Sequence, residues 1–293
     1  MKRITLISLV GLIIGVILLL GGMSLIGFDF ANLSTARRET TTHEIPQSFD
    51  NISIEVDTAD VRFAAATDGK CKIVCHESTN AKHTVSVANG TLSVQNSSDL
   101  KWYDHIGINT DDEYVILYLP TTAYNTLSVV TDTGDVEMPS PFTFQNASIE
   151  TDTGDVEWKA AVASTLSITV DTGDIEVENI SVNNLTVESD TGDAELSSIQ
   201  CQTLSAKTNT GDVECTGVVA SEKITIETDT GDVELNDCDA AELWIKTSTG
   251  DVSGRLLTEK EYICNSSTGD VRVPDTTGGK CEITTDTGDI YFR

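Results

Sequence analysis

Basic and aromatic residues are scarce in this chain of 293 residues. It has 18 lysines and arginines against 47 aspartates and glutamates, a formal net charge of −29, and an aromatic content of 5%. A nucleic-acid-binding surface needs clustered basic side chains to neutralise phosphates, so the composition excludes that class of partner. The strongly negative field would instead attract metal ions, polycations and basic peptides.

Histidine is also scarce, and its four copies, His43, His76, His83 and His105, all precede residue 127. The long C-terminal part therefore offers no Ser-His-Asp or Cys-His combination for nucleophilic catalysis. Carboxylates for glycoside hydrolysis occur everywhere, and nothing singles out one pair. The sequence thus predicts a protein that is not an enzyme and has no catalytic residues and no organic cofactor.

Cysteine shows no pairing pattern. Cys71 and Cys75 are four residues apart on one expected strand, about 13 Å, which is too far for a disulfide. The other cysteines replace Val, Ile or Leu at core positions of the repeat described below. We therefore expect buried thiols that act as small hydrophobic side chains at seven positions: Cys71, Cys75, Cys201, Cys215, Cys238, Cys264 and Cys281.

No charged residue occurs between Ile4 and Phe28. These residues would form about 37 Å of helix, enough to cross a hydrocarbon core of about 30 Å, and no small-residue cleavage site follows closely. We predict an uncleaved, single-pass transmembrane anchor at 1–28 and a polar stalk at 29–48. Basic residues flank the span on both sides, so they do not fix its direction. The acidic, lysine-poor composition of the rest favours an extracytoplasmic location at the cell membrane.

What the sequence has in abundance is one tripeptide, Thr-Gly-Asp, which occurs nine times between Leu127 and Arg293. Its glycines are 19 or 20 residues apart, a period typical of solenoids, whose units bury their apolar faces by stacking on neighbours. The nine glycines are Gly134, Gly154, Gly173, Gly192, Gly211, Gly231, Gly250, Gly269 and Gly288.

Each repeat alternates apolar and polar residues before the glycine and again after it, which indicates two short strands joined by a Thr-Gly bend. A weaker apolar pair in the link, such as Ile180 and Val182, favours a third side. The recurrent Thr-x-Thr, as in Thr131 and Thr133, resembles the pattern of ice-binding solenoids. Here both threonines share parity with core positions, so we expect them to point inward. The predicted fold is all-β, with a parallel β-solenoid of nine coils at 127–293.

Every coil has an aspartate directly after the glycine, and six coils have a glutamate two places later. Carboxylates stacked 4.8 Å apart repel by about 0.9 kcal/mol per neighbour even in water. Two explanations remain open: each aspartate accepts hydrogen bonds from its own turn backbone, or weakly bound divalent cations such as calcium lie between the carboxylates. The candidate metal ligands are Asp135, Asp155, Asp174, Asp193, Asp212, Asp232, Asp251, Asp270 and Asp289.

Residues 49–126 contain strand-like runs without the strict period. The Asn89-Gly90 turn favours a hairpin, and Asp57-Thr58-Ala59-Asp60-Val61 is an imperfect copy of the repeated turn, with alanine in place of glycine. We predict that 49–126 form an antiparallel β cap, which would cover the open N-terminal edge of the solenoid.

Several of these features together resemble the bacterial putative-adhesin family of β-strand-repeat envelope proteins. They are the apolar anchor ending in Gly-Phe-Asp-Phe, the segment Phe49 to Val61, the stretch Trp102-Tyr103-Asp104, the strand from Val115 to Pro120 and the Ser/Thr-Gly-Asp-Val coils. The resemblance implies an envelope location and this architecture, and it supplies no catalytic residues. Some members of the family are associated with envelope-stress sensing.

The sequence therefore predicts a membrane-anchored, non-enzymatic envelope module that presents an acidic solenoid for binding or adhesion. The alternative is an envelope-stress sensor that binds a cationic peptide or other envelope ligand and signals to a membrane-protein partner through residues 4–28. A third possibility is a passive spacer.

Overall fold

The computed structural model describes residues 38–96 and 113–293, which form 25 β-strands and no helix. The all-β class predicted from the sequence is confirmed. Within these two ranges, no helix is long and apolar enough to cross a membrane. The predicted anchor at 1–28 and the start of the predicted stalk lie outside the described residues.

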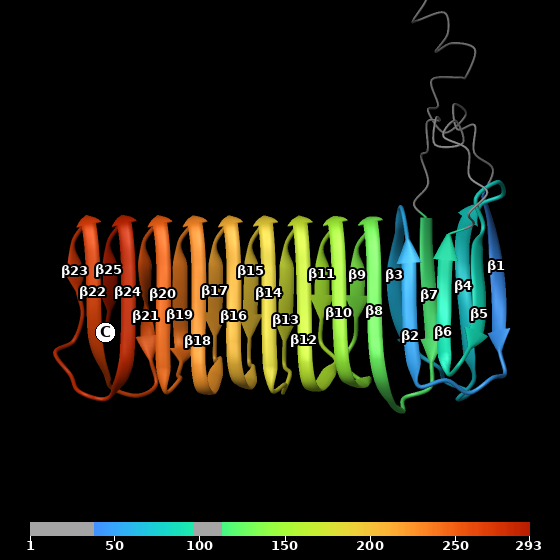
Figure 1. The fold of residues 1–293 in the computed structure, drawn as a ribbon, viewed down its shortest axis with the longest axis horizontal. Helices are drawn as coiled ribbons and strands as arrows, with labels where there is room; N and C mark the ends of the chain where they lie inside the picture. The colour runs from blue at the N-terminus through green and yellow to red at the C-terminus, as the bar shows by residue number, and fades with distance from the viewer. Residues whose placement is uncertain (1–37, 97–112) are drawn as a thin grey trace, which may run out of the picture.

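The strands form a rod made of two long sheets that face each other (Figure 1). The first sheet has twelve strands in the spatial order β22 (Lys260–Thr268), β24 (Gly279–Thr287), β20 (Glu242–Thr249), β18 (Val219–Thr230), β16 (Gln200–Thr210), β14 (Asn184–Thr191), β12 (Ala161–Thr172), β10 (Thr143–Thr153), β8 (Ala123–Thr133), β2 (Asn51–Val56), β6 (Thr91–Asn96) and β5 (His83–Ala88).

The second sheet has thirteen strands, most of them shorter. Their spatial order is β1 (Arg38–Ile45), β4 (Cys71–Ser78), β7 (Glu113–Leu119), β3 (Ala59–Ala65), β9 (Val136–Met138), β11 (Val156–Trp158), β13 (Ile175–Glu178), β15 (Ala194–Ser197), β17 (Val213–Thr216), β19 (Val233–Cys238), β21 (Val252–Leu256), β25 (Ile290–Phe292) and β23 (Val271–Arg272).

Each repeat contributes one long strand to the twelve-stranded sheet and one short strand to the other, joined at the Thr-Gly-Asp turn. Neighbouring coils pair in parallel and in register, so that Val187 lies between Ile168 and Ala206 in one column of the core. The predicted parallel solenoid of nine coils is confirmed. Its core lies between the sheets and consists of the inward positions of both strands. These are almost completely buried except in the coil of β22 and β23, where Val271 is 44% exposed.

The predicted three-sided cross-section is wrong, because the coils have two sheets. The third apolar pair of each link is buried, as at Ile180, but it forms only isolated bridges or a short extension of the next long strand. One such bridge joins Ser181 to Gln200. In β16 the extension and the main strand are separated by a bulge between Cys201 and Thr203. The third side is therefore too short to form a sheet of its own.

The N-terminal cap mixes parallel and antiparallel pairing, which corrects the prediction of an antiparallel cap. Strands β2 and β3 form a tenth coil, because β2 pairs in parallel with β8 and β3 with β9. Strands β6 and β7 add a further parallel layer. Among the strands of the described residues, the antiparallel pairs are β1–β4, β4–β7 and β5–β6. Residues 38–45, expected in the stalk, form the edge strand β1.

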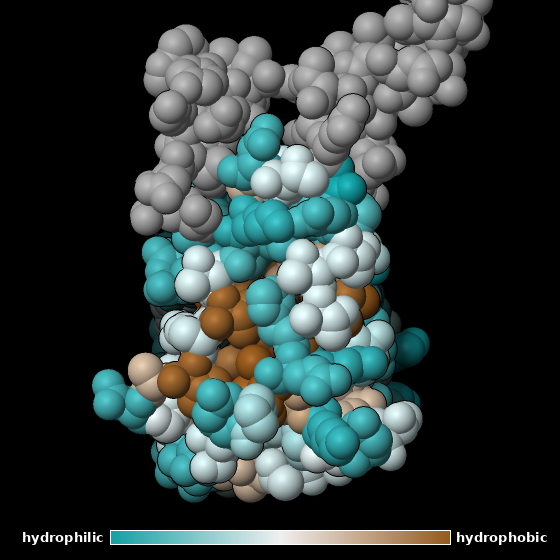
Figure 2. Space-filling view, turned by 90° about the vertical axis from the view of Figure 1, so that its right-hand side faces the viewer, coloured by the Kyte–Doolittle hydropathy of each residue, from teal (hydrophilic) through white to brown (hydrophobic). Residues whose placement is uncertain are grey.

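The N-terminal end of the rod is not completely closed over its core. Figure 2, which views the molecule from this end, shows apolar side chains between the surrounding hydrophilic ones. Ile45 on β1 and Val85 and Val87 on β5, the two edge strands, are only partly buried against the core. A row of four aromatic rings runs through the first coils. Phe49, Tyr124 and Phe144 are stacked, and the ring of Trp158 is tilted by 52° against that of Phe144.

At the C-terminal end the coils do not follow the chain order. The last coil, β24 and β25, is inserted between the coil of β20 and β21 and the coil of β22 and β23, which is therefore outermost (Figure 1). The glycine pair Gly278-Gly279 allows this insertion. A Cβ at Gly278 would lie 2.0 Å from the carbonyl oxygen of Glu259, and one at Gly279 would lie 2.7 Å from that of Ala241.

Lys260 fastens the outermost coil across the inserted one. Its side chain is almost completely buried, and its Nζ donates hydrogen bonds to the Ala240 carbonyl oxygen at 2.6 Å and to the Thr258 hydroxyl at 2.8 Å. The same ammonium group is 2.6 Å from Oδ1 of Asp239. A buried ammonium is stable only when it is paired and hydrogen-bonded in this way.

Candidate functional site

The Thr-Gly-Asp turns of all coils stack along one edge of the rod, which we call the acidic edge. In Figure 1 it is the upper edge, where the long strands end. The aspartate after each glycine is exposed in all nine repeats. The first threonine of Thr-x-Thr is inward, as predicted, and buried at Thr131. The prediction for the second is wrong: Thr133 and its counterparts are exposed, because the turn interrupts the alternation.

The glycine of the turn is required by the stacking of one coil on the next. A Cβ on Gly192 would lie 2.0 Å from the carbonyl oxygen of Gly173, a distance at which the backbone must move. The φ of Gly192 is 144°, which residues with a side chain rarely adopt. In the first coil Ala59 replaces the glycine, and on its other side it pairs with Glu113 at the start of β7. On that side of Ala59 the neighbouring strand has no Gly-Asp turn whose backbone a Cβ would approach, so alanine is accepted at this position.

In six of the nine repeats an inward hydroxyl also connects neighbouring coils. Among the described residues, the hydroxyls of Thr131 and Thr151 have no partner, and the third repeat has Val170 at this position. Thr208 donates a hydrogen bond to the Gly192 carbonyl oxygen at 3.1 Å, and Thr247 donates one to that of Gly231 at 3.2 Å. The same bond recurs at Ser189, Thr228, Ser266 and Thr285. These inward side chains therefore stabilise the turn and are not available to a ligand.

The aspartates of the acidic edge form a hydrogen-bonded ladder along the rod. Oδ1 of Asp193 accepts a hydrogen bond from the backbone N–H of Asp212 at 2.7 Å, and each aspartate of the series makes the same contact with the next coil. The ladder begins at Asp60 and ends at Asp270, with nine bonds of 2.7–3.1 Å through Asp135, Asp155, Asp174, Asp193, Asp212, Asp232, Asp251 and Asp289.

This ladder explains how the carboxylates tolerate their spacing. Hydrogen bonds to charged groups contribute about 1.5–3 kcal/mol, which exceeds the repulsion of about 0.9 kcal/mol expected per neighbouring pair. The partner differs from the one predicted, since the donor is the next coil and not the aspartate's own turn. Asp60 belongs to the ladder but was not among the sequence candidates. The sequence signal for Asp60 is its place in the imperfect repeat Asp57-Thr58-Ala59-Asp60, where it occupies the position of the repeated aspartate.

The glutamates two places later form a second column beside the ladder. Consecutive coils place Glu195, Glu214 and Glu234 in direct register. Arginines occupy the same column near the two ends of the rod. Arg62 lies opposite Glu137 on the neighbouring strand, and Arg272 lies opposite Tyr291. Six consecutive coils carry the column: Glu137, Glu157, Glu176, Glu195, Glu214 and Glu234.

Partial desolvation and, after it, the crowding of carboxylates raise carboxyl pKa values on both sides of the acidic edge. At Glu214 partial desolvation raises the carboxyl pKa, and repulsion from Glu195 and Glu234 raises it further. At Asp132, on the face of the twelve-stranded sheet, desolvation also raises the pKa, followed by repulsion from neighbouring aspartates. Since the charged forms are disfavoured there, a bound cation at the acidic edge would relieve this repulsion.

The geometry brings few of these acids close enough to share a metal ion. In the part of the chain that the structure describes, three ligand atoms of Cys, His, Asp or Glu come within 4.8 Å of one another at two places, and neither includes an aspartate of the ladder. One of the two lies on the thirteen-stranded sheet beside the acidic edge, where Lys159 already bridges Glu157 and Glu178. The two groups are Glu157, Glu176 and Glu178, and Cys75, Glu77 and His83.

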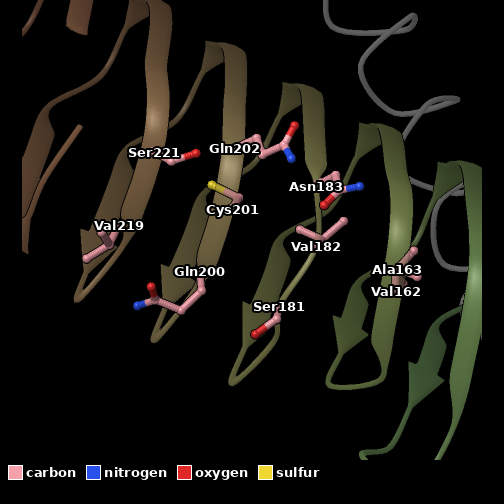
Figure 3. A pocket seen from close by; sticks show the side chains of 10 residues that line it. All are labelled: Val162, Ala163, Ser181, Val182, Asn183, Gln200, Cys201, Gln202, Val219 and Ser221. Carbon is pink, nitrogen blue, oxygen red and sulfur yellow. The ribbon is translucent and has the colours of Figure 1, made fainter. Parts of the chain in front are cut away.

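The opposite edge of the rod has a different chemistry. There the links form a shallow groove of about 420 Å³ (Figure 3), lined by ten small polar and apolar residues, none of which is an acid. Gln200 lies between Ser181 and Val219 in one of its rows. This groove therefore offers no carboxylate, whereas another link of the same edge carries Asp237 and Asp239, which are paired with Arg255 and Lys260.

The seven cysteines are all unpaired, and five of them are buried. Burial raises the pKa of Cys281 and Cys75 to about 12, and at Cys75 the charge of Glu77 contributes as well. Such thiols are protonated at neutral pH and behave as small apolar side chains. The prediction of buried thiols is confirmed for these five, whereas Cys201 and Cys264 are only partly buried.

Comparison with known proteins supports the family resemblance. The model of the family Toastrack DUF4097 matches residues 49–253. A putative adhesin from Bacteroides fragilis is similar in structure, with 18% identity, a TM-score of 0.52 and coverage of 88% of this chain and 97% of that one. A putative adhesin from Parabacteroides distasonis gives 10% identity, a TM-score of 0.53 and coverage of 88% and 98%. No curated protein matches the sequence.

Proposed function

Since the chain belongs to the Toastrack DUF4097 family, we propose that it is a membrane-anchored, non-enzymatic module of the cell envelope that binds cationic partners along its acidic edge. The observation that carries the proposal is the ladder from Asp60 to Asp270. It uses one oxygen of every carboxylate before Asp270 internally, and it arranges an unbroken row of charge along the rod. The similarity to solved putative adhesins supports a binding role.

The regular spacing favours a partner with several positive charges. A single exposed ion pair contributes at most about 1 kcal/mol, so one lysine or one monovalent cation would bind too weakly to matter. A polycation contacts several coils at once, and its further contacts form at high effective concentration. A cationic peptide or a basic envelope polymer fits this description.

The test is the binding of a labelled decalysine peptide, followed by fluorescence anisotropy at several salt concentrations. The variant Glu176→Gln/Glu195→Gln/Glu214→Gln neutralises three exposed glutamates in adjacent coils of the column beside the acidic edge. The control Glu150→Gln/Glu188→Gln/Glu227→Gln removes the same charge from the face of the other sheet. We expect the first variant to bind several-fold more weakly and the control to bind like the wild type. Equal losses would show that only net charge matters.

Divalent cations are a second class of ligand for the same edge. We propose weak binding of calcium to the carboxylate oxygens not used in the ladder, since hard cations take oxygen ligands. Calcium at millimolar concentration should then raise the melting temperature more than sodium does at matched ionic strength. Equal shifts would indicate simple screening and would exclude specific binding.

The proposed location is the outer side of the cell membrane, with residues 4–28 as a single-pass anchor. The basis is the uncharged run in the sequence and the acidic, lysine-poor composition after it. Protease added to intact cells whose wall has been removed should degrade the repeats. Full protection until the cells are broken would place the repeats in the cytoplasm.

An envelope-stress sensor would share the acidic edge and differ in needing a membrane-protein partner for residues 4–28. Crosslinking on intact cells, followed by identification of the attached proteins, separates the two roles. A binding or adhesion module should be crosslinked through its rod to envelope components. A sensor should also give a specific crosslink between its anchor and one integral membrane protein.

A further inference from the structure

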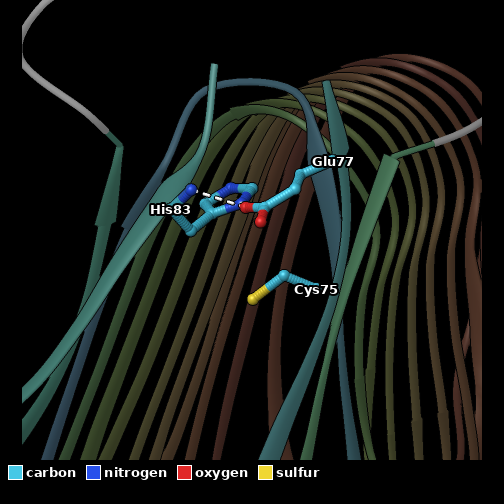
Figure 4. Close-up of side chains that lie close together, drawn as sticks. All are labelled: Cys75, Glu77 and His83. Atoms are coloured by element: carbon cyan, nitrogen blue, oxygen red, sulfur yellow. Dashed lines mark hydrogen bonds and ion pairs between the residues drawn. The ribbon is translucent and has the colours of Figure 1, made fainter. Parts of the chain in front are cut away.

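A buried cluster of Cys, Glu and His side chains lies in the cap, at the N-terminal end of the rod (Figure 4). Cys75 and Glu77 are two residues apart on β4, so they point to the same face of the strand. His83 comes from β5, the edge strand of the opposite sheet. The exposed fractions of these three residues are 0%, 1% and 7%, respectively. The cluster therefore joins the two sheets at the N-terminal end of the core.

The contacts within the cluster leave one buried atom without a partner. Oε2 of Glu77 is 2.9 Å from Nδ1 of His83 and accepts a hydrogen bond from the His83 backbone N–H at 2.6 Å. Oε1 of the same carboxylate is buried and has no hydrogen-bond partner among the described residues. A carboxylate in the core requires full pairing, because an unsatisfied buried acceptor costs about 1–3 kcal/mol.

We propose that Cys75, Glu77 and His83 bind a divalent transition-metal ion of the zinc class. Their Sγ, carboxylate oxygen and imidazole nitrogen atoms all lie within 4.8 Å of one another, and these are the three ligand types that zinc takes in proteins. Metal–ligand bonds of about 2.0–2.3 Å place tetrahedral ligands roughly 3.3–3.8 Å apart, so small side-chain movements suffice. The orphaned Oε1 of Glu77 gains a partner in this way.

Charge also favours this metal class. A thiolate and a carboxylate balance a doubly charged cation, and the imidazole is neutral, so the loaded cluster has no net charge in the core. Binding must release the proton of the Cys75 thiol to solvent, which makes the affinity fall as the pH is lowered. Three protein ligands leave one position open for water or an external ligand. The metal would thus fasten β4 of one sheet to β5 of the other.

The alternative is that Glu77 and His83 form only an ion pair that stabilises the cap. Cobalt(II) distinguishes this alternative from a metal site, because it gives an intense near-ultraviolet charge-transfer band only when a thiolate is a ligand. We expect the full-length protein in detergent to show this band with one cobalt per chain and to retain one zinc after dialysis. Adventitious binding to the surface carboxylates would give no such band.

Variants of matched chemistry assign the ligands. Cys75→Ser and His83→Gln should each weaken zinc binding at least about tenfold, and Cys75→Ser should abolish the cobalt band. The controls Cys71→Ser and His76→Gln change the same residue types at positions of β4 outside the cluster, and they should bind like the wild type. A wild-type protein without the thiolate band would overturn the proposal. So would controls that lose the metal as completely as Cys75→Ser and His83→Gln.

Discussion

The middle of the rod and its C-terminal end contain the same repeat but are assembled differently. From Gly134 to Gly250 the coils stack in chain order, and identical contacts repeat at each step. At the C-terminal end the last coil, β24 and β25, lies between the two coils that precede it in the chain. A single buried lysine, Lys260, connects the outermost coil to the residues beyond the inserted one. Regular stacking thus distributes stability over many equal contacts, whereas the end depends on a few individual ones.

Deletions test the regular part most severely. Removal of one whole period, Asp193 to Gly211, joins Gly192 to Asp212 and keeps all columns in register, so the protein should fold with a modest loss of stability. Removal of nine residues, Asp193 to Cys201, shifts the remaining coil and buries acids where apolar residues belong. We expect that variant not to fold. Circular dichroism and protease resistance distinguish them, and equal stability of the two would refute the stacked-coil description.

The glycine column should be nearly as sensitive. Gly192→Ala places a Cβ 2.0 Å from the carbonyl oxygen of Gly173 and also strains φ, so we expect a loss of about 3–5 kcal/mol in chemical denaturation. The control is Gly69→Ala in the cap, where φ is +70° but nothing lies within 4 Å of the new Cβ. Backbone strain alone should cost about 1–2 kcal/mol there. Similar losses at both sites would mean that stacking is not the reason for the glycines.

At the C-terminal end the decisive residue should be Lys260. Lys260→Met leaves the Asp239 carboxylate without its buried partner, and we expect a loss of about 3 kcal/mol or more. Lys246→Met is the matched control in the middle of the rod, because its ion pair with Glu227 is exposed and should contribute at most about 1 kcal/mol. Hydrogen exchange should locate the loss in residues 257–293. A loss spread evenly over all coils would argue against a local fastening role.

The sequence predicted the regular part well because its information is periodic. Residues one period apart share a column, so the core, the turn glycines and the exposed aspartates followed from the spacing alone. The period does not say which coil is the neighbour of which, and an inserted last coil preserves every column. Only Gly278-Gly279, a glycine pair outside the repeated turn, and Lys260 at a core position distinguish the C-terminal end.

The cap was predicted less well for a related reason. Without a strict period, alternation identifies strands but not their partners, and so the parallel pairing of β2 and β3 was missed. The bond from Asp193 to the next coil was missed because a pattern within one coil cannot name a donor in another. The cluster around Glu77 and His83 combines residues that are individually unremarkable in the sequence, and only the pairing of the strands brings them together.

Substitutions of Asp193 separate the contribution of the ladder hydrogen bond from that of the carboxylate charge. Asp193→Asn keeps an oxygen that can accept the hydrogen bond from the Asp212 N–H, and it removes a charge from the row. Its stability should equal that of the wild type within about 0.5 kcal/mol. Asp193→Ala removes the acceptor and should cost about 1–2 kcal/mol. If thermal denaturation shows equal losses for both variants, the carboxylate charge and not the hydrogen bond would be the stabilising feature.

The smallest expected effect concerns repulsion within the glutamate column. Glu214 lies between Glu195 and Glu234, and its pKa is raised in the folded protein by desolvation and then by these neighbours. A carboxyl group with a raised folded-state pKa destabilises the fold when it is ionised, and this cost is relieved as the pH falls through that pKa. Glu214→Gln should therefore stabilise the protein at pH 7 by about 0.2–0.5 kcal/mol.

The control for this effect is Glu188→Gln on the other sheet. Glu188 lies between Thr169 and Lys207, so its charge is attracted rather than repelled by its neighbours. Neutralising it should leave the stability unchanged or lower it slightly. The melting temperature of each variant is compared with the wild type at pH 7 and again at lower pH, where the advantage of Glu214→Gln should disappear as the wild-type carboxyl becomes protonated. If Glu188→Gln stabilised the protein as much as Glu214→Gln, the relief would come from lower net charge and not from the column.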